Sequence, residues 1–70
     1  MNEDTLLLCK KLFFLHGMNK FSSDELKIDI IEFYKLVGED ILHSNVEYRN
    51  GKPYRFARFT DNFVNLLDNL

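Results

Sequence analysis

The chain has 70 residues, of which 46% are hydrophobic, and its 9 lysine and arginine side chains against 11 aspartate and glutamate side chains leave a net charge of −2. That apolar fraction excludes an intrinsically disordered chain, and the length predicts a single domain over residues 1–70. The one cysteine, Cys9, excludes an internal disulfide, which small secreted domains usually need. No apolar run approaches the roughly 20 residues of a membrane helix. We therefore expect a cytoplasmic protein whose apolar surplus lies in a dense core or in a partner interface.

The first predicted helix covers residues 2–15 and ends at His16-Gly17 in the manner of a helix C-cap. Leu7 and Phe14 fall on the flanks of its core stripe, so the helix is apolar around most of its circumference. The stripe recurs at helical spacing and consists of Leu6, Leu8, Cys9, Leu12, Phe13 and Leu15. A helix of this kind lies at the centre of a fold or under a partner. We expect Leu7 and Phe14 to contact that partner.

The start of a second helix is predicted at Ser23. Ser22 and Glu25 fit a capping box, and Phe21 with Leu26 fits the hydrophobic staple that often accompanies it. The expected core stripe is Leu26, Ile30, Phe33 and Val37, flanked by Ile31 and Tyr34. Gly38 favours a break, with residues 39–43 forming a separate short helix, and the alternative is a helix that continues through Ile41.

A β-hairpin is predicted over residues 45–59, around the dipeptide Asn50-Gly51. Two registers compete for it. A two-residue turn pairs Val46 with Arg55 and mixes apolar and charged side chains on both faces. A three-residue loop, with Gly51 left-handed, pairs Val46 with Tyr54 instead. We favour the three-residue loop because it alone gives the hairpin an apolar face, made of Val46, Tyr48, Tyr54 and Phe56.

A last short helix begins after a cap at Thr60 or Asp61, with an apolar stripe of Phe63, Leu66, Leu67 and Leu70. So short a helix is unstable alone in water and must dock on its own domain or on another chain. The predicted fold is an α-rich α+β domain in winged-helix-like order: two main helices, the short third helix, the hairpin and the C-terminal helix.

The inventory of reactive side chains argues against an enzyme. Cys9 and His16 share a helix face but lie about 10 Å apart along the axis, too far for a nucleophile and its base. No residues have the spacing of a four-ligand metal site, and the three scattered glycines form no phosphate-binding loop. We expect no catalytic residue, no metal and no cofactor.

Charge is distributed unevenly along the chain. Residues 21–47 hold seven acidic and two basic side chains, whereas residues 48–70 hold four basic and two acidic ones. The four basic residues are the predicted partner-binding charges: Arg49, Lys52, Arg55 and Arg58. In the favoured register Arg49 and Lys52 lie at the exposed tip, Arg55 projects from the face opposite Val46, and Arg58 is partly covered near the base. They can contact an acidic protein surface, contact nucleic acid, or only solubilise an exposed strand.

Residues 51–56, Gly-Lys-Pro-Tyr-Arg-Phe, followed by a short apolar helix, resemble the wing and next helix of the small excisionase and MerR-type DNA-binding domains. The resemblance does not extend to the recognition helix expected before the wing, where residues 39–44 are short and acidic. We therefore expect first a small non-enzymatic regulator or inhibitor. It would dock on a larger protein, or on a second copy, through an apolar patch and the basic hairpin. The alternatives are a winged-helix-like DNA-binding regulator and a small structural subunit of a complex.

Overall fold

The computed structural model describes residues 1–69, so Leu70 of the predicted C-terminal stripe lies outside the described residues. The elements are, in order, α1 (Glu3–His16), β1 (Phe21–Ser22), the 3-10 helix η1 (Ser23–Leu26), α2 (Ile30–Gly38), β2 (Leu42–Arg49), β3 (Lys52–Phe59) and α3 (Asp61–Asp68). The α-rich α+β class and the winged-helix-like order predicted from the sequence are confirmed.

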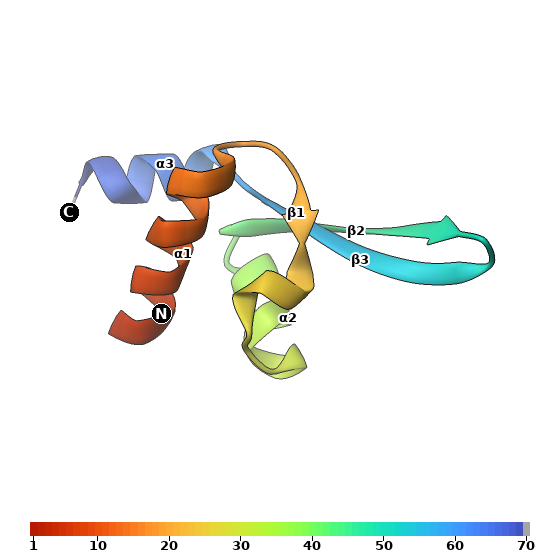
Figure 1. Cartoon of the computed structure of the whole chain (residues 1–70). Helices are drawn as coiled ribbons and strands as arrows, with labels where there is room; N and C mark the ends of the chain where they lie inside the picture. Colours follow the sequence, from red (N-terminus) through yellow and green to blue (C-terminus); the bar gives the residue numbers. More distant parts are fainter. Residues whose placement is uncertain (70) are drawn as a thin grey trace.

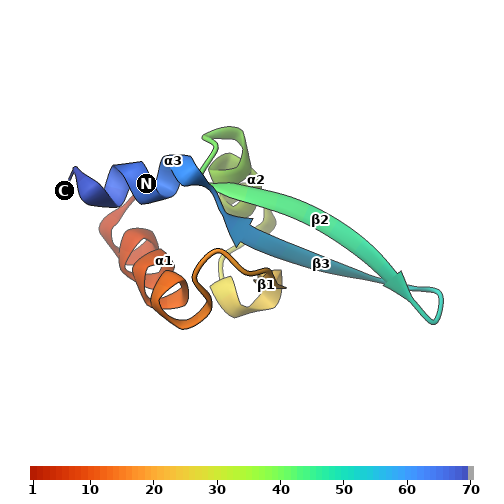
Figure 2. The ribbon, with the colours of Figure 1, turned by 90° about the horizontal axis from the view of Figure 1, so that it is seen from above.

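A long hairpin projects from a helical body (Figures 1 and 2). The antiparallel sheet has the strand order β1-β3-β2, and β1 pairs only with Phe56 and Ala57 of β3. The outer half of the hairpin therefore has no third strand beside it. This projection accounts for the elongated dimensions of 42 × 22 × 19 Å.

α1 forms where the sequence predicts it. The Asn2 side chain accepts a hydrogen bond from the Thr5 backbone N–H at 2.8 Å, and Gly17, with φ of 60°, ends the helix. The prediction that Leu15 belongs to the core is wrong, because Leu15 is exposed. The core contacts the side of α1 that carries Cys9 and Leu12, and His16 continues that side by stacking on Phe21 at 5.1 Å between ring centres.

The predicted start of the second helix holds for only one turn. The Ser22 side chain accepts a weak 3.4 Å hydrogen bond from the Asp24 N–H and begins η1, which stops at Lys27 in the left-handed region. The Asp29 carboxylate then accepts a hydrogen bond from the Glu32 N–H at 2.8 Å and begins α2. Because α2 begins anew after Asp29, its residues face the core in a different helical phase from the one predicted.

Leu26 and Phe33 of that stripe are buried as predicted, but Ile30 is half exposed and Val37 only partly buried. Leu36, outside the predicted stripe, takes a buried position. The expected end of the helix at Gly38 is confirmed.

The short helix predicted for residues 39–43 is wrong. Glu39 and Asp40 form a turn, with Asp40 at φ of 60°, and β2 begins at Leu42. The hairpin therefore starts earlier than the predicted residue 45.

The favoured hairpin register is also wrong. Val46 pairs with Arg55 and Glu47 with Tyr54, which is the two-residue turn. Asn50 and Gly51 both have positive φ, 54° and 77°, the combination of a type I′ turn. The outer half of the hairpin covers no core and needs no apolar face, so the sorting of side chains does not decide the register.

This register and the alternation of side chains along a strand define two faces of the hairpin. The inner face, which carries the buried residues, consists of Leu42, Ser44, Val46, Tyr48, Pro53, Arg55, Ala57 and Phe59. The outer face consists of His43, Asn45, Glu47, Arg49, Lys52, Tyr54, Phe56 and Arg58.

An aromatic cluster joins the helices to the base of the sheet. Phe59 of β3 stacks on Phe63 of α3 at 4.7 Å between ring centres, and Phe13 of α1 contacts both rings edge-on. Thr60 caps α3, as one of the two predicted caps. Because Phe63 is fully buried, α3 docks on its own domain rather than needing another chain.

Candidate functional site

Exposed apolar side chains lie on α2 and on the inner face of the hairpin, two elements that meet at Arg55. On α2 the exposed side chains include Ile31, which is 78% exposed, and on the hairpin Tyr48 is 73% exposed. The two elements are neighbours there, because the guanidinium of Arg55 on β3 lies 5.3 Å from the ring centre of Tyr34 on α2. We call this surface the α2–hairpin face and define it by Ile30, Ile31, Tyr34, Val46 and Tyr48, all of them exposed.

Arg55 lies inside this surface. The prediction that it projects from the face opposite Val46 is therefore wrong. It shares the inner face with Val46, its partner across the strands. Its guanidinium carbon lies 5.3 Å from the Tyr34 ring and 5.9 Å from the Phe33 ring, so α2 holds it by cation–π contacts. Its Nε–H is buried and has no hydrogen-bond partner among the described residues. Arg55 also lines two surface hollows, one with Val46 and Pro53 and the other with Ile28 and Ile30.

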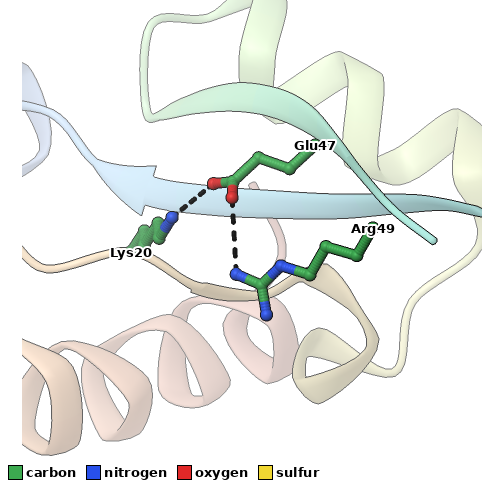
Figure 3. Close-up of polar contacts among 3 residues, drawn as sticks. All are labelled: Lys20, Glu47 and Arg49. Carbon is green, nitrogen blue, oxygen red and sulfur yellow. Dashed lines mark hydrogen bonds and ion pairs between the residues drawn. The ribbon is translucent and has the colours of Figure 1, made fainter. Parts of the chain in front are cut away.

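Arg49 is engaged within the chain. The Glu47 carboxylate accepts a hydrogen bond from Lys20 and another from Arg49 at 3.3 Å, and Figure 3 shows it between the two cations. The hydrogen bond from Lys20 is the main reason that the pKa of Glu47 lies below its usual value. Both cations also lie over the Phe56 ring, at 4.8 Å for Lys20 and 5.2 Å for Arg49. The charge of Arg49 is thus partly neutralised before any partner arrives.

Lys52 and Arg58 form no ion pair within the described part of the chain. Lys52 lies beside the turn at the tip, as predicted. Arg58 lies on the outer face at the base, and it is exposed rather than partly covered. It lies across the strands from His43.

Arg58 and His43 also line a cleft of about 580 Å³ between the hairpin base and the loop before β1. The cleft is lined by Met18, Asn19, Lys20, His43, Ser44, Asn45, Phe56, Ala57 and Arg58, without an acidic side chain.

Leu7 and Phe14 are exposed, by 62% and 89%, on α1. α1 lies in the helical body, away from the tip of the hairpin (Figure 1). The predicted partner-binding residues therefore do not form one site. The sequence did not indicate Ile30, Ile31 and Tyr34 as site residues. The predicted helix begins at Ser23, and in that phase these residues lie in or beside its core stripe. Asp29, a good N-cap residue before an apolar run, was the signal that could have found them.

Cys9, the one cysteine of the chain, lies in the core. Cys9 is fully buried, and burial together with the nearby Glu32 carboxylate raises the pKa of its thiol to about 11. The thiol is therefore protonated at neutral pH and a poor nucleophile. No group of three or more His, Cys, Asp and Glu side chains in this range could hold a metal ion. None of the described helices is long and apolar enough to cross a membrane.

Comparison of the chain with protein-family models, curated proteins and solved structures finds no match. Function has to be inferred from the surfaces of the molecule.

Proposed function

We propose that this chain is a small non-enzymatic binding protein, a regulator or inhibitor that docks on a larger protein through the α2–hairpin face. The observation that carries the proposal is the exposure of Ile30, Ile31 and Tyr34 on the helix that precedes the hairpin. Aromatic and other apolar side chains are typical of the centre of a protein interface. A cytoplasmic location remains part of the proposal.

The same helix, α2, is unlike a recognition helix that enters the major groove of DNA. Helix-turn-helix proteins place polar and basic side chains of the recognition helix against bases and phosphates. Here the exposed side chains of α2 are mostly apolar, with Lys35 as its one exposed base, and the exposed carboxylates of Asp29 and Glu39 flank its two ends. Those carboxylates would repel a phosphate backbone.

The hairpin charges would orient the partner rather than bind it alone. Lys52 at the tip and the partly neutralised Arg49 give the projecting end a positive potential, which speeds encounter with an acidic surface. Arg55 has a different role in this proposal. It lies within the α2–hairpin face, held against Phe33 and Tyr34, so its positive charge can attract a partner's carboxylate.

The test is quantitative co-purification from the native host with wild type, Ile31→Glu and, as a matched control, Asn65→Glu on the exposed side of α3. We expect one partner in a fixed ratio with wild type and with Asn65→Glu, retained at high salt, and absent with Ile31→Glu. Capture that is equal for all three proteins would contradict the proposal.

A winged-helix-like DNA-binding regulator is the second candidate. The element order, the projecting hairpin and the acid-free cleft with Arg58 and His43 favour it. It predicts binding to duplex DNA whose affinity falls linearly with salt on a logarithmic plot. Replacing Lys52 and Arg58 by Glu should then reduce the salt slope by about 1 for each phosphate that is no longer neutralised, while Ile31→Glu has little effect.

A further inference from the structure

The exposed side of α1 carries a second apolar stripe, separate from the α2–hairpin face. Leu7, Lys11 and Phe14 recur at intervals of four and three residues on the side opposite the buried Thr5, Cys9 and Leu12. This is the spacing with which one helix packs lengthwise on another. Single exposed apolar residues are ordinary, but Leu7, Phe14 and Leu15 are exposed together on one helix, which indicates a contact surface.

Charges on the same side of α1 are arranged in two blocks of opposite sign. Glu3 and Asp4 are exposed in the first turn, and Lys10 and Lys11 are exposed two turns later. None of these four side chains forms an ion pair within residues 1–69. A partner helix that runs in the opposite direction and carries the same two blocks would neutralise both of them.

We propose that a second copy of this chain binds along the exposed side of α1, antiparallel, with a two-fold axis through Leu7. Leu7 then meets the partner's Leu7, Glu3 lies opposite the partner's Lys10, and Asp4 lies opposite the partner's Lys11. Phe14 extends past the start of the partner helix and covers the partner's Met1, which is exposed in the single chain.

The charges exclude the two obvious competing arrangements. A parallel pair of α1 helices would bring acids against acids and lysines against lysines. An antiparallel pair centred between Leu7 and Phe14 would place Lys10 against the partner's Lys11. Only the register through Leu7 gives attraction at both ends of the contact.

The dimer is weak and leaves the proposed docking surface free. A helix of 14 residues is about 21 Å long, so the pair of α1 helices buries less area than a standard interface, and we expect a micromolar dissociation constant. α1 lies at the end of the molecule away from the hairpin tip (Figure 2), so each copy can still present its α2–hairpin face. The inference therefore goes beyond the proposed function and does not depend on it.

The test is analytical ultracentrifugation of the full chain over a range of concentrations, with folding checked by circular dichroism. We expect a monomer–dimer equilibrium for wild type. Leu7→Glu should be monomeric, because it places two carboxylates at the two-fold axis. Tyr48→Ser on the hairpin is the matched control and should dimerise like wild type. A wild type that stays monomeric at millimolar concentration, or a dimer that Leu7→Glu leaves unchanged, would overturn the proposal.

A charge-swap pair tests the register. Lys10→Glu with Lys11→Glu should weaken self-association by roughly tenfold or more, and so should Glu3→Lys with Asp4→Lys, because in each variant the facing pairs then carry like charges. Self-association of either folded variant that equals that of wild type would overturn the antiparallel register, because in a parallel pair like charges already face each other in wild type. An equimolar mixture of the two variants should form a heterodimer, since acids again face lysines, and its failure to associate would overturn the contact along α1.

Discussion

The hydroxyl group of Thr60 joins the hairpin to α3. It accepts a hydrogen bond from the Phe63 N–H at 3.2 Å and donates to the Asp40 carbonyl oxygen, with the Ile41 carbonyl oxygen 3.3 Å away. Thr60 is almost fully buried, so water cannot replace these bonds. One side chain thus caps a helix and fixes the turn after α2.

Replacing Thr60 by valine keeps the shape of the side chain and removes these hydrogen bonds. We expect Thr60→Val to lower the free energy of unfolding by about 2 kcal/mol. Thr60→Ser keeps the hydroxyl and loses only a buried methyl group, so its cost should be about 1 kcal/mol or less. Urea denaturation measures both, and a Thr60→Val variant as stable as wild type would show that the hydroxyl contributes nothing.

Cys9 makes the stability depend on pH in the alkaline range. Its pKa is raised from an ordinary 9.0 to about 11 in the folded protein, so the folded state holds the thiol proton more tightly than the unfolded state does. The resulting stability is present below pH 9 and is lost as the pH rises to about 11. Over this interval wild type should lose on the order of 2 kcal/mol more than Cys9→Ala. Thermal denaturation curves with the same pH slope for both proteins would contradict this.

At the scale of elements, the turn residues predict the hairpin register better than the hydrophobic pattern does. The helices α1 and α3 were predictable because a cap and an apolar stripe agree in each of them. The hairpin register could not be predicted from an apolar face, because such a face is required only where a core lies beneath it. The outer half of the hairpin has no such core, and β1 pairs with β3 only at Phe56 and Ala57. Asn50-Gly51 was the better guide.

The same lesson applies to the candidate site. Arg49 and Lys52 were correctly expected near the tip, whereas the position of Arg55 followed the wrong register. The pairing of Glu47 with Lys20 joins residues far apart in sequence, so no local pattern could reveal it. The exposure of Ile30 depended on Asp29 restarting the helix in a new phase.

Two glycine substitutions test the turn assignments, because we expect them to change the free energy of unfolding in opposite directions. A Cβ atom at Gly51 or Gly38 meets nothing within 4 Å, so only the backbone decides the outcome. Gly51 has φ of 77°, and Gly51→Ala should weaken the hairpin by about 1 kcal/mol. Gly38→Ala, at the end of α2, should stabilise the protein by up to about 1 kcal/mol.

The Gly51 effect should be local, because the tip projects from the body. Amide hydrogen exchange near the turn should therefore accelerate in Gly51→Ala with little change in global unfolding. Unchanged exchange at the Glu47 and Tyr54 amides would argue against the two-residue turn.

At the scale of the whole molecule, the surfaces are divided between the two ends. The helical body exposes the α1 stripe with Leu7 and Phe14, and the hairpin with α2 exposes the α2–hairpin face. The two proposals therefore fail or hold separately. Loss of dimerisation leaves the docking proposal intact, and loss of docking leaves the dimer intact.

The most direct test of the docking proposal is amide hydrogen exchange of this chain, free and bound to the partner recovered from the native host. We expect slower exchange on binding in α2 and in the outer half of the hairpin, around Tyr34 and Tyr48. We expect little change at the outer cleft around Arg58. Protection confined to that cleft, with α2 unaffected, would contradict the claim that the α2–hairpin face is the docking surface.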